Sequence, residues 1–335
     1  MAVIKANAYG HGMIPIARTL ADVDCLAVAR LAEAKVLRRA GIDQPIALLG
    51  GVLSREDLAE ALSLELQLGV HDEQQIRWLE EQTDATAVAW LKIDTGMNRL
   101  GIHPANAADA MARLGNCVQD LRLMTHFSSA DDPDVPTTTE QLARFLPLIE
   151  GFDGDVSVAN SAGVLAWAET LEQLGDVREQ GRLWIRPGLA LYGISPFAGG
   201  NGMDLGLEPA MQFEATLMSV KKLAAGDRVG YGGSWQAERD TVMGVIAAGY
   251  GDGYSRYIPT GTPVLLNGRK VPVIGRVSMD VTTVDLGTGA ADQVGDRVIL
   301  WGEVLPVEEV AEHAGTIPYQ LVTGVSHRES PVIEE

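Results

Sequence analysis

The segment VIKANAYGHG, residues 3–12, is the first indication of the fold, because a short apolar run leads directly into Lys5 and a set of small residues. Similar apolar, β-branched runs recur to about residue 195 and alternate with segments of helical period. These runs begin near Ala2, Cys25, Pro45, Leu66, Ala87, Leu121, Asp155 and Arg182. The alternation is typical of repeated βα units around a parallel sheet. Eight units predict an α/β fold, a (β/α)8 barrel over residues 1–200.

The helical segments between these runs carry their own start signals. Ser54 can cap a helix that extends to Leu64, with Asp57 completing a start that resembles a capping box. A second amphipathic segment covers residues 72–82.

A different pattern begins after a loop rich in Gly and Pro, residues 195–209. Short strand-like runs then follow one another with turn signals between them. Asn267-Gly268 separates two such runs, and both residues tolerate the positive φ of a tight hairpin turn. We therefore expect a second, mostly β C-terminal domain over residues 205–335.

Composition excludes several functional classes. The 335 residues carry a net charge of −19, and an acidic surface repels phosphate backbones and acidic membranes. The longest apolar runs fall well short of the roughly 20 residues that span a bilayer. Cys25 and Cys117 lack CxxC spacing, which argues against a disulfide framework or a structural metal site. We expect a cytoplasmic protein that binds no nucleic acid, membrane or metal.

In a (β/α)8 barrel, polar residues just past the strands are the candidates for chemistry. Those that follow the predicted strands are Lys5, Lys92 to Arg99, His126, Asn160, Ser161 and Arg186. A lysine at a buried strand end is suited to Schiff-base chemistry, since burial lowers its pKa. Gly188 and Leu189 open the segment after the eighth strand, where barrels commonly bind phosphate. Each residue alone also fits a structural role, such as a lysine that reaches solvent, a turn or a buried histidine.

Eight motifs occur in order along nearly the whole chain: KANAYGHG, LKIDTGMNRLG, THFSSAD, ANSAG, IRPGLALYG, AAGYGDGYSR, GRVSMD and IPYQL. Together they resemble the alanine racemase family, enzymes of fold type III that use pyridoxal 5'-phosphate (PLP). The resemblance implies PLP-dependent interconversion of L-alanine and D-alanine by a two-base mechanism. Lys5 would bind the cofactor covalently and act as one base, and Tyr250 of the partner subunit would be the other.

The same resemblance implies further roles position by position. Arg99 would contact both PLP and the substrate carboxylate, and Met279 would bind that carboxylate through its backbone N–H. Lys92 matches a lysine that is often carbamylated in the family. The remaining cofactor-binding residues would be Tyr9, His126, Ser161, Arg186, Gly188, Leu189 and Tyr319. The substrate entrance would be lined by Asp131, Arg276 and Ile317.

Two positions depart from the family pattern. Ser157 stands three residues before Asn160, where some members carry a histidine near the catalytic tyrosine, so the environment of Tyr250 is expected to differ. The family also normally has a strand and a helix ahead of KANAYGHG, whereas this sequence starts four residues before Lys5. We therefore expect a chain that lacks these elements. Whether its barrel closes is not decided by the sequence.

The resemblance also implies a homodimer and a link to D-alanine for peptidoglycan. A PLP decarboxylase and a non-catalytic PLP-binding barrel are the alternatives. The motif Ser278-Met279-Asp280 in place of a cysteine-centred one speaks against the first, and the long β domain against the second. A biosynthetic or a catabolic role, and activity on serine, remain open.

Overall fold

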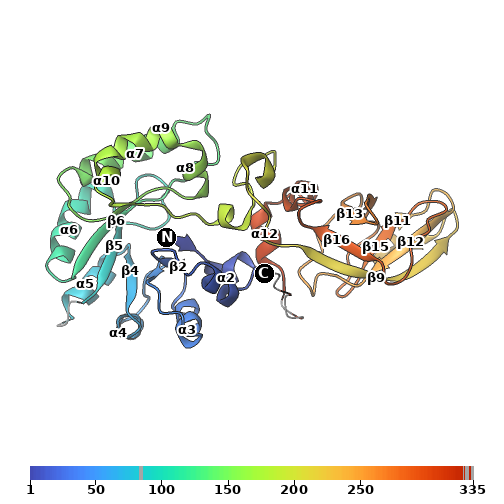
Figure 1. The fold of residues 1–335 in the computed structure, drawn as a ribbon, viewed down its shortest axis with the longest axis horizontal. Helices are drawn as coiled ribbons and strands as arrows, with labels where there is room; N and C mark the ends of the chain where they lie inside the picture. The colour runs from blue at the N-terminus through green and yellow to red at the C-terminus, as the bar shows by residue number, and fades with distance from the viewer. Residues whose placement is uncertain (83–85, 327, 329–331, 333–335) are drawn as a thin grey trace. The chain divides into compact units, whose positions relative to one another are not determined.

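The structure is a computed structural model that describes residues 1–82, 86–326, 328 and 332 (Figure 1). The chain forms two compact units. Unit 1 comprises Met1–Ala8, Gly12–Leu191 and Pro196–Ala198. Unit 2 comprises Tyr9–His11, Tyr192–Ser195 and Gly199–Glu335.

Unit 1 is built around an eight-stranded parallel sheet whose strands lie side by side in sequence order. The strands are β1 (Ala2–Val3), β2 (Leu26–Val28), β3 (Ile46–Leu48), β4 (Leu66–Val70), β5 (Val88–Lys92), β6 (Asp120–Met124), β7 (Val156–Ser157) and β8 (Leu183–Trp184). The backbone N–H of Val3 in β1 donates to the carbonyl of Pro187, just past β8, at 3.0 Å. This hydrogen bond joins the two ends of the sheet, and the predicted (β/α)8 barrel is confirmed.

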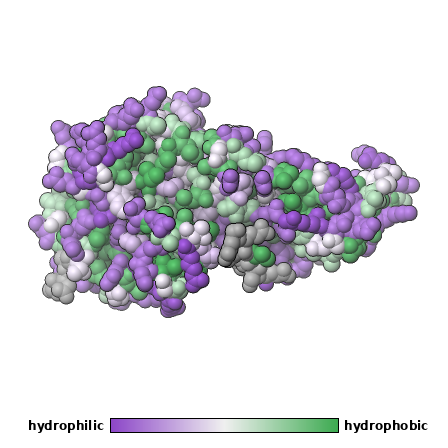
Figure 2. Space-filling model, viewed as in Figure 1, coloured by the Kyte–Doolittle hydropathy of each residue, from purple (hydrophilic) through white to green (hydrophobic). Residues whose placement is uncertain are grey.

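Helices surround these strands (Figure 1). Ser54 caps α4 by accepting from the backbone N–H of Asp57 at 3.1 Å, as the sequence predicts. Figure 2 shows hydrophilic side chains along the outer rim of unit 1 and hydrophobic ones toward its middle. The helical segments are α1 (Lys5–Tyr9), α2 (Met13–Thr19), α3 (Leu31–Arg39), α4 (Arg55–Ser63), α5 (Glu73–Glu80), η1 (Pro104–Asn106), α6 (Ala107–Gly115), α7 (Thr137–Ile149), α8 (Ser161–Ala166), α9 (Ala168–Leu171), η2 (Glu172–Leu174), α10 (Gly175–Glu179) and η3 (Leu189–Tyr192).

Unit 2 is mostly antiparallel β structure, as predicted, and its main sheet has the strand order β14-β13-β16-β9-β12-β15. β9 (Phe213–Leu223) is the longest of these strands and pairs with both β12 and β16. The other elements are η4 (Gly202–Leu205), β10 (Arg228–Val229), η5 (Tyr231–Gly233), β11 (Trp235–Gln236), β12 (Thr241–Ile246), β13 (Pro263–Leu266), β14 (Arg269–Pro272), β15 (Thr282–Asp285), β16 (Arg297–Trp301), α11 (Val307–His313) and α12 (Pro318–Thr323).

The predicted hairpin turn joins β13 to β14. Asn267 and Gly268 have φ values of 49° and 76°, the positive range that this turn requires. The strands on either side pair in register from Leu266 opposite Arg269 to Pro263 opposite Pro272.

None of the helices in the described part of the chain has the length and apolar character that crossing a membrane requires.

Candidate active site

Lys5 lies at the end of β1 and begins a left-handed turn. Ala6, Asn7 and Ala8 have φ of 52°, 55° and 53°, and the turn is closed by the Ala8 N–H, which donates to the Ile4 carbonyl at 2.9 Å. Left-handed helical backbone costs roughly 1–2 kcal/mol per non-glycine residue. Such a conformation persists only where surrounding contacts fix it, and those sites are commonly functional.

Asn7 makes two of the contacts that hold the left-handed turn in place. Its side-chain carbonyl accepts from the backbone N–H of Met13 at 2.8 Å, and its main-chain carbonyl accepts from the Gly12 N–H at 3.0 Å. The polar side chain therefore ties the turn to the start of α2.

Basic side chains from separate strand ends influence one another across the barrel mouth. Burial lowers the pKa of Lys5, and Arg99 and Arg186 lower it further, while Glu33 opposes them. Burial also lowers the pKa of Lys92 to about 8, assisted by Arg186, Arg99 and Lys5 and opposed by Asp94. Unit 1 thus collects cations at this end of the barrel with few carboxylates to balance them.

Arg186 is 4% exposed, and the bonds described for it go to neutral groups. Its Nη1 donates to the Ser157 hydroxyl at 2.5 Å, and its Nη2 donates to the carbonyl of Thr125 at 2.6 Å and to that of Val158 at 3.4 Å. Burial lowers its pKa to about 10. The guanidinium therefore keeps its charge at neutral pH although no carboxylate in the described part of the chain pairs with it.

His126 lies beside Arg186, with its Nδ1 3.3 Å from Arg186 Nη2. Burial lowers the pKa of His126 well below its ordinary value, and Arg186, Lys92 and Arg99 act in the same direction. A neutral ring accepts at Nδ1 from the guanidinium, which assigns the ring proton to Nε2.

The Ser157 side chain has two defined contacts. Its hydroxyl accepts from Arg186 and donates to the Trp184 carbonyl at 2.9 Å. The residue therefore links the ends of β7 and β8 around the buried guanidinium.

Ser161 joins the loops that follow β7 and β8. Its Oγ accepts from the backbone N–H of Gly188 at 2.9 Å and of Ala190 at 3.2 Å. No bond donated by this hydroxyl is found among the described residues, so its proton can be donated to an anion. Asn160 caps α8, the helix that begins at Ser161, by accepting from the Gly163 N–H at 2.9 Å. The segment after β8 is a 3-10 turn that starts at Leu189.

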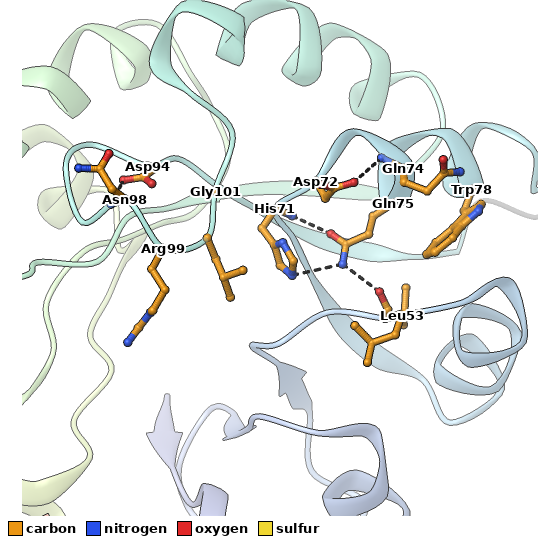
Figure 3. Close-up of a pocket in the computed structure, with 12 residues that line it drawn as sticks. Leu53, His71, Asp72, Gln74, Gln75, Trp78, Asp94, Asn98, Arg99 and Gly101 are labelled. Atoms are coloured by element: carbon orange, nitrogen blue, oxygen red, sulfur yellow. Dashed lines mark hydrogen bonds between the residues drawn. The ribbon is translucent and has the colours of Figure 1, made fainter.

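Arg99 lies on the loop that follows β5. Asp94 shapes this loop by accepting from the N–H groups of Gly96 and Asn98, and the Ile102 N–H ties it back to the Lys92 carbonyl at 2.8 Å. Figure 3 shows Arg99 pointing away from Asp94 and Asn98, on the wall of a cavity of about 530 Å³. The cavity is also lined by Val52, Leu53, His71, Asp72, Gln74, Gln75, Trp78, Leu100 and Gly101.

Unit 2 holds the predicted tyrosines. The Tyr9 ring lies 5.0 Å from Tyr192 and 6.0 Å from Tyr319 between centroids, and burial raises the pKa of Tyr9. A Cβ on Gly10 would come within 1.9 Å of the Val322 carbonyl, so only glycine allows this approach to α12. Tyr9 and Tyr319 are brought together within this unit.

Tyr250 follows β12 and is 38% exposed. Its N–H donates to the Ser278 carbonyl at 3.0 Å, and Gly251 N–H donates to the Met279 carbonyl at 2.8 Å. The Arg256 guanidinium lies 5.8 Å from the Tyr250 ring centroid. Tyr250 and Met279 are thus neighbours.

The predicted entrance residues are exposed. Ile317 is 59% exposed, and Asp131 and Arg276 are also exposed. Met279, the predicted substrate-binding residue, is 54% exposed. Within the described residues, no group of three or more His, Cys, Asp or Glu side chains could hold a metal ion.

Sequence reasoning did not anticipate Arg256, Glu33 or the buried Gln141. Gln141 donates to the Thr95 hydroxyl and the His126 carbonyl. Arg256 ends one of the quoted motifs, so its position alone could have drawn attention to it.

Two family models match the chain. The alanine racemase N-terminal domain matches residues 1–196, and the alanine racemase C-terminal domain matches residues 210–333.

Curated relatives and solved structures cover nearly the whole chain. An alanine racemase from Aeromonas hydrophila is 49% identical over 332 residues, which is 98% of this chain and 90% of the relative. One from Vibrio cholerae is 48% identical, with 98% and 89% covered. A biosynthetic alanine racemase structure from Pseudomonas aeruginosa matches with a TM-score of 0.89 and 41% identity, covering 98% of this chain and 90% of that one. An alanine racemase structure from Acinetobacter baumannii has a TM-score of 0.89 and 34% identity, with the same coverage.

Proposed function

The chain belongs to the alanine racemase family, and we propose that it interconverts L-alanine and D-alanine with PLP as its cofactor. One observation carries the chemistry of this proposal. The barrel mouth of unit 1 brings together the partly buried Lys5 and the buried Arg186, whose charges the described carboxylates do not balance. A buried charge is costly unless a partner compensates it, so this arrangement favours an anionic ligand.

The residues present fit PLP. Its phosphate would accept from the Ser161 hydroxyl and from donors of Tyr9, Leu189 and Tyr319, and it would share the Gly188 N–H with Ser161 Oγ. His126 would lie against its ring. Arg186 Nε has no hydrogen-bond partner among the described residues and can donate to the ring nitrogen. When bound, PLP delocalises the negative charge that develops at the substrate Cα.

Lys5 and Tyr250 would move the proton on opposite faces of the substrate. The lowered pKa of Lys5 increases the fraction of neutral amine, which is the form that binds the cofactor covalently and takes a proton from Cα. Tyr250 Oη would deliver or remove the proton on the other face. Two bases on opposite faces invert the centre without requiring the substrate to turn over.

Arg186 would control which carbon receives the proton. Even with a pKa lowered to about 10, it remains a cation at neutral pH and does not give its proton to the ring nitrogen. By keeping its proton, Arg186 would disfavour protonation away from Cα, which leads to transamination.

Lys92 would act as a carbamate. The Lys92 ammonium would first lose one proton to solvent. The neutral amine would then add to the carbon of CO₂ and release a second proton, so that the cation becomes an anion. That anion would accept from Arg99 and orient it toward the substrate carboxylate, which Met279 N–H would also bind. The supporting observation is the lowered pKa of Lys92, which makes neutral amine available.

The active enzyme would be a homodimer in which Tyr250 of one copy meets Lys5 of the other. The support is the exposure of large side chains in unit 2, including Tyr257 at 85% and Met279 at 54%, besides Tyr250 itself. Asp131, Arg276 and Ile317 would line the entrance.

A chiral assay tests the proposal. The purified chain is incubated with L-alanine, with and without added PLP, and D-alanine is measured over time. D-alanine formation that depends on PLP is the expected result. Release of CO₂ would indicate a decarboxylase instead, and bound PLP without turnover would indicate a carrier.

A further inference from the structure

Glu33, on α3 of unit 1, receives hydrogen bonds from two different strand ends. Its Oε2 accepts from the backbone N–H groups of Ala29 and Arg30, just past β2, at 2.8 and 2.9 Å. Its Oε1 accepts from the N–H of Ala6, just past β1, at 2.6 Å. The bond from Arg30 is that of a capping box, whereas the bond from Ala6 reaches a residue 27 positions away.

Ala6 N–H belongs to the peptide group that follows Lys5. Fixing this peptide plane fixes the backbone torsion on the carboxyl side of Lys5 Cα. Ala6 also begins the left-handed turn, with φ of 52°, a conformation that alanine adopts rarely. The contact with Glu33 therefore acts at the point where the chain leaves β1 and enters the unfavourable conformation.

We propose that Glu33 is a positioning residue for Lys5: its carboxylate holds the Lys5–Ala6 peptide at the start of the left-handed turn and so directs the lysine amine. This inference rests on the proposed function, because it assigns Lys5 the covalent attachment of PLP. Glu33 acts through the backbone next to Lys5 and is not assigned a contact with cofactor or substrate.

Charge gives Glu33 a second influence on Lys5. Among the groups that act on Lys5, Glu33 raises its pKa, whereas burial and the neighbouring cations lower it. The titratable groups coupled electrostatically to Lys5 are Arg99, Arg186, Lys92, His126 and Glu33. The carboxylate thus limits how far the amine loses its proton while it fixes the amine's direction.

The alternative is that Glu33 only caps α3, and Asp57 provides the matched control. Asp57 occupies the corresponding position at the start of α4, where its Oδ2 accepts from the Leu53 N–H at 3.2 Å. Its described contacts do not include residues 5–9. Asp57→Asn removes a capping carboxylate without touching the left-handed turn.

The experiment compares Glu33→Gln, Glu33→Asp and Asp57→Asn in the 335-residue chain after bound PLP has been removed with hydroxylamine. PLP attachment is followed by absorbance from pH 6 to 10, and the site is verified by borohydride reduction and mass mapping to Lys5. Amide exchange of Ala6 is measured in parallel, with the Leu26 amide, which donates to the Pro45 carbonyl, as the reference.

Glu33→Gln is expected to slow attachment by roughly ten-fold or more, because misplacing a reacting group by 1 Å can cost about 10²-fold. The pH profile of PLP attachment should shift to lower pH in this variant, and amide exchange at Ala6 should accelerate. Glu33→Asp keeps the charge but shortens the reach, so it should speed exchange at Ala6 while the pH profile stays in place. Asp57→Asn should leave attachment, profile and Ala6 exchange unchanged.

The proposal would be overturned if Glu33→Gln and Asp57→Asn had the same effect on PLP attachment at Lys5 and on amide exchange at Ala6. If the Glu33 variants do not fold, the wild-type chain decides: protection of the Ala6 amide comparable to that of Leu26 supports the contact, and exchange at the unprotected rate rejects it. Wild-type chain that attaches PLP at Lys5 without racemising alanine would refute the proposed activity and leave the Glu33 comparison valid.

Discussion

Lys92 is expected to form a carbamate at pH 8 far more readily than an exposed lysine of the same chain. Burial, Arg186 and Arg99 lower its pKa to about 8, so about half of the amine is neutral at that pH. An ordinary lysine with a pKa of about 10.4 is neutral to only roughly 0.4%. The reactive fraction is therefore about 100-fold larger at Lys92.

The assay is ¹³C NMR of the chain in ¹³C-labelled bicarbonate, with signal assignment by Lys92→Gln. Lys222→Gln, which removes an exposed lysine on β9, is the control and should leave the carbamate signal intact. The signal should decrease as the pH falls from 8 to 6, because the amine is protonated over this range.

Arg186→Gln tests whether the charge of Arg186 helps to lower the pKa of Lys92. Arg186 is the leading charge that lowers the Lys92 pKa, so its removal should raise that pKa and weaken the carbamate signal at pH 8. The reasoning is refuted if Lys92→Gln keeps the signal, or if Arg186→Gln strengthens it.

Three further outcomes are expected. Lys5→Ala should abolish both the absorbance of attached PLP and racemisation, and borohydride labelling of another lysine would contradict this role. Arg186→Glu should lower racemisation and raise transamination, since a carboxyl group can share a proton with the ring nitrogen; an unchanged ratio of the two reactions counts against it. Lys5→Ala and Tyr250→Phe chains refolded together should recover roughly a quarter of wild-type activity, because random mixing gives about half heterodimers, each with one intact site. No recovery in verified heterodimers would exclude a shared site.

The sequence predicted the barrel because each strand of a parallel sheet is a short apolar run with its own boundary signals. Each of the eight expected strand starts lies within one residue of the observed one. The Asn267-Gly268 turn and the Ser54 cap were equally predictable, since both depend on residues adjacent in sequence.

The left-handed turn after Lys5 could not be predicted in this way. The residues Lys5 to Tyr9 have no glycine, and alanine ordinarily favours a right-handed helix. The turn depends on contacts from elsewhere, such as Glu33 with Ala6, which the local pattern does not contain. A capping-box pattern at Glu33 indicates where a helix starts. It does not indicate that the Glu33 carboxylate also accepts from the Ala6 N–H.

The electrostatics of the site could not be predicted from the sequence for a related reason. A chain with net charge −19 gives no sign of a cationic centre, because net charge sums over positions and does not say where carboxylates are missing. Arg186 meets the Thr125 carbonyl 61 residues away and the Ser157 hydroxyl 29 residues away, and neither contact involves a charge. The carboxylates that offset the lysines are Glu33 at Lys5 and Asp94 at Lys92. Because burial and neighbouring cations together outweigh these two, the folded chain keeps both amines more easily deprotonated than free lysine, and this is the condition that the proposed chemistry requires.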